Sequence, residues 1–300
     1  MRILVLIVLV GGCMVGAEPR QFSADQPLPA DLAEGDIVVL GEIGVIVPPP
    51  GQTAGVIAEQ DDGNSVRLVV QNPVGGAVRL VEAPEPVTGP VAVTDFATVN
   101  ECNDGAYNLE GSHWTTNYSW YFDAGSTPSA NSQANVEIGL QTGANAITNQ
   151  RNKCGYVDKV SATNSYAGRT TAAPNLTANS TTVTCGNTDG KNVVGFGYLP
   201  TNYLAITCDW YGADNVSFEA DIRLNSRRSW FSQAVPSGCS NKDGIEQVST
   251  HEFGHVFGLA HVSQTTHPEL TMSPQAAPCS NDKLNLGWGD IRGLRALYPL

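Results

Sequence analysis

Three of the five histidines in this 300-residue chain fall within the segment HEFGHVFGLAH at 251–261. On an α-helix, residues four apart lie about 40° apart around the axis, so His251 and His255 point the same way. Two imidazoles one turn apart can bind a single metal ion. Asp243 and Glu246 have the spacing of a capping box, which places the start of this helix near residue 244. A buried helix that presents two imidazoles to one ion is therefore the strongest constraint on the fold.

The third histidine needs a break in the helix to reach the same ion. A helix continued to His261 would turn its side chain about 240° away from that of His255. Gly258 lies between them, and glycine readily adopts the left-handed conformation that ends a helix and reverses the chain. We therefore expect His251, His255 and His261 to converge on one Zn²⁺.

Three neutral imidazole ligands leave a fourth position of a tetrahedral zinc ion open for water, as in catalytic sites. The +2 charge would lower the pKa of that water toward about 7. Glu252 follows the first ligand directly, so we expect it to accept the proton of the water as general base and to return it to the leaving group. This composition produces the full pattern by chance with a probability on the order of 1 in 10⁵.

The string at 251–261 matches H-E-x-x-H-x-x-G-x-x-H and resembles the zinc signature of the metzincin metallopeptidases. That family also has a methionine turn beneath the metal, and the segment TMSP at 271–274 follows the last histidine. Met272 is then the residue that supports the histidines without being a ligand. Asp290 is expected to cap a helix, with support of the site from behind as the alternative.

Within the metzincins the chain is most similar to the matrixins. Residues 289–298 resemble the closing helix of their catalytic domains, and residues 219–224 resemble the strand before the active-site helix. The resemblance implies an α+β fold, with a twisted mixed sheet packed on helices, and a zinc-dependent endopeptidase with protein or peptide substrates. Matrixins stay latent through a cysteine of the pro-segment, whereas residues 18–101 contain no cysteine. Latency by that route is not expected.

The first seventeen residues have the pattern of a secretory signal peptide: one positive charge, a short apolar run and a small-residue end. This predicts a secreted protein, and the alternative is lipid anchoring through Cys13. Either route leaves six cysteines, which in an exported chain imply three disulfides among fifteen possible pairings. We expect Cys239 to pair with Cys279, because that bridge would fix both halves of the site. The remaining pairs are then Cys185 with Cys208 and Cys102 with Cys154.

Three segments follow: a signal peptide at 1–17, a β-rich N-terminal segment at 18–98 that is a candidate propeptide, and a catalytic domain at 99–300. Short β-branched runs predict strands at 36–40, 44–47, 65–70 and 77–81 in the N-terminal segment, and further strands at 119–122, 193–196, 204–208 and 220–224. An amphipathic pattern predicts a helix over 132–150. No residue between 18 and 95 has recognisable chemistry.

The charge balance excludes some classes of partner. Sixteen Lys and Arg against twenty-nine Asp and Glu give a net charge of −13, which argues against nucleic acid. No segment has the length of a transmembrane helix. Calcium is compatible with the many carboxylates, but no loop has its ligand spacing. His113 and His267 lack the spacing of a second zinc site.

Two rival functions stay open: a catalytically silent zinc-containing binding or adhesion protein, and a zinc hydrolase of small amides or esters.

Overall fold

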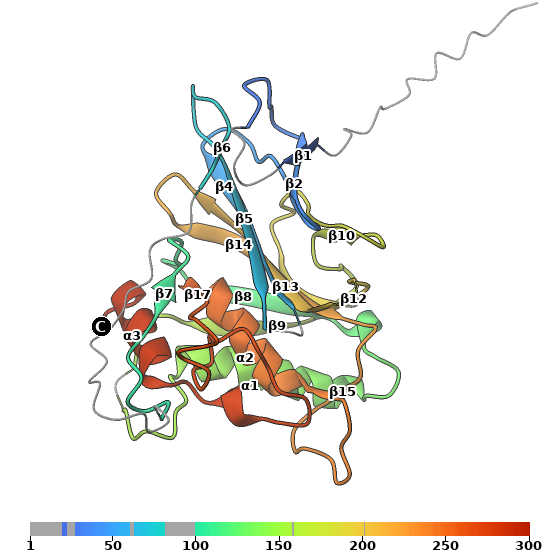
Figure 1. Cartoon of the computed structure of the whole chain (residues 1–300), viewed down its shortest axis with the longest axis vertical. Helices are drawn as coiled ribbons and strands as arrows, with labels where there is room; N and C mark the ends of the chain where they lie inside the picture. Colours follow the sequence, from blue (N-terminus) through green and yellow to red (C-terminus); the bar gives the residue numbers. More distant parts are fainter. Residues whose placement is uncertain (1–19, 23–27, 61–62, 82–99, 158, 201) are drawn as a thin grey trace, which may run out of the picture.

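The N-terminal and C-terminal parts of the chain share two β-sheets (Figure 1). The computed structural model describes residues 20–22, 28–60, 63–81, 100–157, 159–200 and 202–300. The predicted signal peptide with Cys13 lies outside the described residues, as do residues 82–99 around the predicted domain boundary. The fold is α+β, a mixed sheet with few helices, as predicted.

The larger sheet has eight strands in the order β6-β5-β4-β13-β14-β12-β8-β9. Its strands are β4 (Gln52–Gln60), β5 (Ser65–Asn72), β6 (Arg79–Leu80), β8 (Tyr118–Asp123), β9 (Asn164–Thr170), β12 (Asn192–Gly197), β13 (Tyr203–Gly212) and β14 (Ser217–Asn225). Strand β13 is antiparallel to both of its neighbours, β14 and β4. The N-terminal strands β4–β6 thus extend the sheet of the C-terminal part beyond β13.

The smaller sheet also mixes the two parts, in the order β1-β2-β3-β11-β10. It consists of β1 (Arg20–Phe22), β2 (Ile37–Leu40), β3 (Ile43–Ile46), β10 (Leu176–Ala178) and β11 (Val183–Cys185). Two short pairs complete the strands: β7 (Asn108–Leu109) with β17 (Leu259–Ala260), and β15 (Trp230–Phe231) with β16 (Asp243–Gly244). The join between β3 and β11 is parallel.

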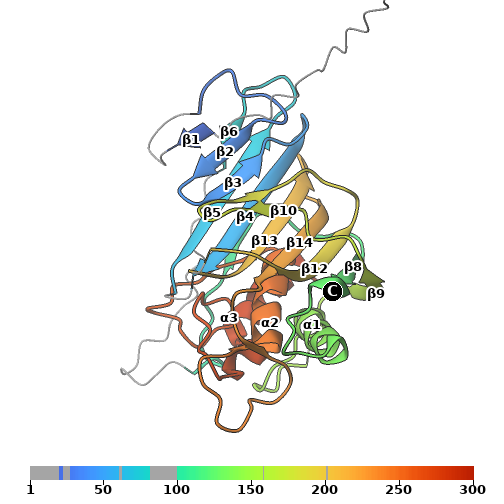
Figure 2. The same ribbon diagram turned by 90° about the vertical axis from the view of Figure 1, so that its right-hand side faces the viewer.

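The helices lie together beside the larger sheet, away from β1–β3 (Figure 2). They are α1 (Gln133–Thr148), α2 (Ile245–Val256) and α3 (Trp288–Leu297), with 3-10 turns at Ala124–Ser126 and Asp282–Leu284. Helix α1 begins where predicted because the side chain of Ser132 accepts a hydrogen bond from the Asn135 backbone N–H. Among the described residues, no helix is long and apolar enough to cross a membrane.

Two apolar cores lie on the two faces of the larger sheet. The first packs the sheet against the helices and includes Trp120 and Phe253. The second joins the two sheets and includes Val56 of β4, Val183 of β11 and Trp210 of β13. Because burial of apolar surface is the main favourable contribution to folding, the second core binds the N-terminal strands firmly to the rest of the chain.

Most predicted strands are found within a few residues of their expected ends, but β4 was not predicted. The prediction of a capping box at the start of α2 is wrong. Gly244 is the N-cap, without a side-chain hydrogen bond, and the Asp243 carboxylate instead accepts from Arg228 Nε at 2.7 Å. An ion pair with a neighbouring segment has replaced the local contact that the spacing indicated.

All three expected disulfides are present. They join Cys102 to Cys154, Cys185 to Cys208 and Cys239 to Cys279. The last of them links the segment before α2 to the loop after the methionine turn, so both flanks of the histidine helix are covalently tied together. The second bridges β11 of the smaller sheet to β13 of the larger one.

Candidate metal centre

The three histidines of the sequence motif converge as predicted. His251 and His255 lie one turn apart on α2. Gly258, just after the end of this helix, has a φ of +83° and turns the chain away from the helix axis. The two residues of β17 then pair with β7 and lead to His261. The three Nε2 atoms lie 3.0–3.1 Å from one another.

For His251 and His255, the contact of the opposite ring nitrogen sets the tautomer of the neutral ring. His251 Nδ1 lies 2.7 Å from the carbonyl oxygen of Thr271, and His255 Nδ1 lies 2.8 Å from that of Leu259. A carbonyl oxygen only accepts, so each of these two Nδ1 atoms carries a proton, and each ring presents an unprotonated Nε2 when it is neutral. Two nitrogen lone pairs cannot form a hydrogen bond with each other. Such a buried set of imidazole donors fits a bound Zn²⁺.

A fourth donor, Glu59, comes from the N-terminal segment. Its Oε1 atom lies 3.0 Å from His255 Nε2, 3.1 Å from His261 Nε2 and 3.5 Å from His251 Nε2. The four side chains form one group that could hold a metal ion. No residue of this segment has a chemical role that the sequence alone predicts, and the histidine motif predicts an open fourth position. A carboxylate lies there instead, and the only local signal was an acid at the end of an otherwise uncharged run, residues 52–60.

Electrostatics balance charge within this buried group. Burial opposes the charge on Glu59, but the neighbouring carboxyl group of Glu252 and the three histidines outweigh it and hold its pKa well below the usual value. Burial lowers the pKa of His251 to about 4. It also opposes the charge on His255, but Glu110 and Glu59 outweigh burial and raise that pKa to about 9. Bound Zn²⁺ would compete with this proton, since metal ligands must be deprotonated.

Glu252 is fully buried beside the histidines. Its Oε2 accepts a hydrogen bond of 2.6 Å from Thr207 Oγ1 on β13, a contact that the sequence did not predict. Its other oxygen, Oε1, receives no hydrogen bond from the residues that the structure describes. Burial, together with the nearby charge of Glu59, raises the pKa of Glu252 well above its usual value. A buried carboxyl group with one unpaired oxygen is suited to exchanging a proton.

The methionine turn lies under α2. Met272 is buried, and a Cβ atom on Gly254 would overlap its sulfur, so the glycine allows this close approach. Asp290 lies in the first turn of α3, and its carboxylate accepts from the backbone N–H groups of Gly287, Thr271 and Met272 at 2.8–3.1 Å. It therefore stabilises both the start of the helix and the turn.

Replacing Asp290 with asparagine tests this support. The amide can keep only part of the three hydrogen bonds, so we expect a loss of about 1–3 kcal/mol in the free energy of unfolding. Because the Thr271 carbonyl accepts from His251, zinc affinity should fall roughly 10-fold or more. Denaturant unfolding and chelator competition measure the two effects. Asp282→Asn, at an exposed position nearby, is the control and should change neither.

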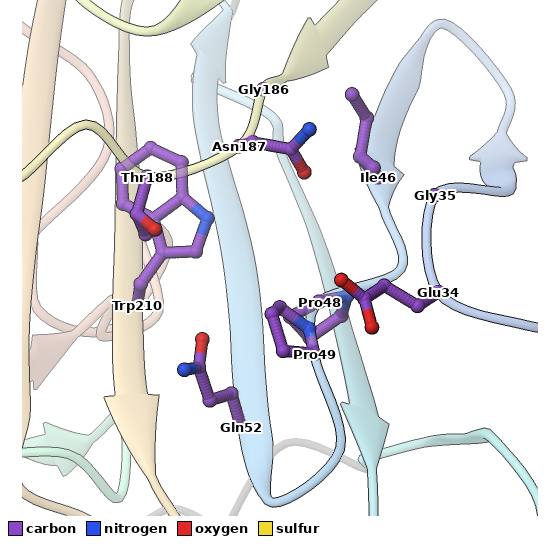
Figure 3. A pocket seen from close by; sticks show the side chains of 10 residues that line it. All are labelled: Glu34, Gly35, Ile46, Pro48, Pro49, Gln52, Gly186, Asn187, Thr188 and Trp210. Atoms are coloured by element: carbon purple, nitrogen blue, oxygen red, sulfur yellow. The ribbon is translucent and has the colours of Figure 1, made fainter.

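A small hollow opens beside the centre and a larger one lies elsewhere. The lining of the small hollow combines apolar side chains, such as Leu204 and Val248, with charged ones: Glu59, Glu252 and Lys283. The larger hollow, about 460 Å³, lies between β3, β4 and β13 (Figure 3). It is lined by Glu34, Gly35, Ile46, Pro48, Pro49, Gln52, Gly186, Asn187, Thr188 and Trp210. None of the four metal-centre residues lines it.

The two remaining histidines lie outside the centre. His267 Nδ1 is 2.8 Å from Asp104 Oδ2, so a hydrogen bond to this buried carboxylate explains its position. The backbone of His113 pairs with that of Val216. Neither side chain joins the group formed with Glu59.

Comparison with known proteins agrees with the resemblance seen in the sequence. The matrixin family model matches residues 203–299, which span β13, the histidine helix, the methionine turn and α3. A search of curated proteins finds no match. The family match and the cluster of histidines together indicate a zinc metallopeptidase.

Proposed function

We propose that this protein is a secreted zinc-dependent endopeptidase in which His251, His255 and His261 bind the metal and Glu252 is the general base. The observation that carries the proposal is the convergence of three imidazole Nε2 atoms beside a buried carboxyl group, Glu252, that has one unpaired oxygen. Three disulfides support export, since such bonds persist in oxidising compartments.

Zn²⁺ in this centre would act as a Lewis acid that acidifies water and polarises the scissile carbonyl. The protein supplies the remaining chemistry. Glu252 takes a proton from the attacking water and delivers it to the leaving amine. Thr207 holds one carboxyl oxygen, which leaves the other to exchange the proton. Met272, packed against Gly254 of the histidine helix, and Asp290, which holds the methionine turn, keep the histidines in place.

The position of β13 favours peptides over small esters or amides. Strand β13 runs past the centre, and an extended peptide could bind by main-chain hydrogen bonds to the edge of β13 that β4 covers in this structure. A site that binds substrate along a strand suits unfolded or extended protein. A silent binding protein would not need a buried acid at position 252.

The test is hydrolysis of casein by purified protein with and without a zinc chelator. Because Glu59 lies in the centre, the assay compares the unchanged chain with Glu59→Ala. We expect the variant to cleave peptide bonds, to lose activity with chelator and to regain it when Zn²⁺ is restored. Mass spectrometry of the products identifies the bonds cut. Hydrolysis of small esters alone, or no loss of activity on chelation, would contradict the proposal.

A further inference from the structure

Strand β4 covers the edge that a substrate would need. It pairs with β13 along its whole length, from Gln52 opposite Gly212 to Gln60 opposite Tyr203. The order of the sheet places β13 between β4 and β14, so β13 would be an edge strand if β4 were absent. An exposed edge is where an extended peptide adds to a sheet. The N-terminal segment therefore occupies the binding position with its own backbone.

The side chains of β4 alternate between the two faces of the sheet. Ala54, Val56 and Ala58 point into the core between the sheets. Ile57 and Glu59 point the other way, toward the histidines. The strand thus combines an apolar face that anchors it with a carboxylate at its C-terminal end. This carboxylate is buried, at 1% exposure, among three imidazoles.

A second contact fixes the neighbouring strand to the site. Arg67 on β5 donates from Nε to Glu110 Oε2 at 2.5 Å and from Nη2 to the Glu110 carbonyl at 3.1 Å. Glu110 lies beside the histidine helix, with Oε1 3.7 Å from His255 Nδ1. The pair is mostly buried, so it is less screened by solvent than a surface pair. The hairpin of β4 and β5 is therefore held at both strands.

We infer that β4 is an internal inhibitor, in which residues 52–60 fill the substrate position on β13 and Glu59 supplies a fourth donor to the metal. The inference rests on the proposed function and adds how that site is regulated. The N-terminal segment has no cysteine that could bind the metal, and in this proposal the Glu59 carboxylate takes that role. Zinc binds oxygen donors from glutamate as well as imidazole nitrogen, so a centre of three histidines and Glu59 is chemically complete.

The principal test compares the unchanged chain with Glu59→Ala and Glu59→Gln, with Zn²⁺ in excess. The glutamine variant keeps the volume of the side chain, which guards against loss of folding. We expect casein hydrolysis to rise by a factor of roughly 10 or more in both, because β4 loses its anchor at the metal, so the strand gives way to substrate more often and water reaches the fourth position. Glu42→Ala, at an exposed position of the same segment, is the matched control and should leave the rate unchanged.

A second measurement does not depend on activity. Each protein is loaded with Co²⁺ and titrated with acetohydroxamate, a small metal-binding probe, while the visible absorption of the metal is recorded. We expect the spectrum of Glu59→Ala to change at a probe concentration at least roughly 10-fold lower than that of the unchanged chain. Far-UV circular dichroism of each protein confirms that the variant is folded.

The outcomes separate the two proposals. Equal hydrolysis and equal probe binding in the unchanged chain and both variants would overturn the inhibitor and leave the peptidase. Easier probe binding without hydrolysis in any protein, also after cleavage between the two parts of the chain and removal of the N-terminal fragment, would overturn the peptidase and support Glu59 as a metal donor. If the folded Glu59→Ala protein no longer retains metal, Glu59 is a permanent ligand of a closed structural site, and the inhibitory role is wrong.

Discussion

Replacing Glu252 with glutamine should nearly abolish hydrolysis while zinc stays bound. Glutamine has the same shape and can still accept the hydrogen bond from Thr207, but it cannot take a proton from water. We expect the rate to fall by roughly 10²–10⁴-fold, the usual contribution of a general base. The measurement is casein hydrolysis in the Glu59→Ala background, with zinc content determined on the same samples.

The matched control is Glu269→Gln, an exposed acid in the loop between His261 and Met272. It removes the same charge without touching the centre and should leave the rate within about 2-fold, as expected of an exposed site away from the chemistry. Equal turnover in Glu252→Gln and its parent would eliminate the proposed role of Glu252. Loss of zinc together with activity would instead indicate a structural role for the carboxylate.

Gly258→Ala should be the most destabilising single substitution near the centre. The backbone has a φ of +83°, and a Cβ atom would overlap the Ser112 carbonyl oxygen and lie 2.9 Å from Leu297 Cδ1. Strained backbone and overpacking together should cost about 3–5 kcal/mol. That corresponds to a fall in melting temperature of about 10 °C or more, measured by thermal unfolding.

Gly111 separates the two causes. Its φ of +93° is also in the left-handed region, but a Cβ atom there would meet nothing within 4 Å. Gly111→Ala should therefore show only the backbone cost, about 1 kcal/mol. Because Gly258 leads directly into β17 and His261, its variant should also bind zinc more weakly. A melting temperature for Gly258→Ala equal to that of Gly111→Ala would show that the overlap is relieved by movement.

The features that the sequence predicted are those encoded locally. The histidine spacing on α2 and the conformation of Gly258 need only helical geometry, and Ser132 marks the start of α1 by a contact three residues away. The pairing of Cys239 with Cys279 followed from where the two lie around the motif. Even so, Asp243 shows the limit of local reasoning, because its carboxylate binds Arg228 rather than the helix end.

The missed features depend on contacts between distant parts of the chain. Strand β4 lacks the clear β-branched pattern of its neighbours, since small residues such as Ala54 and Gly55 take positions next to β13 and β5. Its partner β13 lies about 150 residues further along the chain, so no local pattern of apolar residues predicts that the two strands pair. Glu59 reaches the histidines only because of that register. A motif search restricted to 251–261 could not have found it.

The apolar core shared by the two sheets has a consequence for any cut made between the two parts of the chain. Ile206 and Trp210 on β13, with Val183 on β11, would become solvent-exposed if the N-terminal strands left. A molecule cut between the two parts would therefore persist as a two-chain complex. Its peptidase activity would appear at the rate at which the N-terminal fragment dissociates, rather than at the rate at which the chain is cut. Dilution, or digestion of the released piece, would then set how quickly the centre opens.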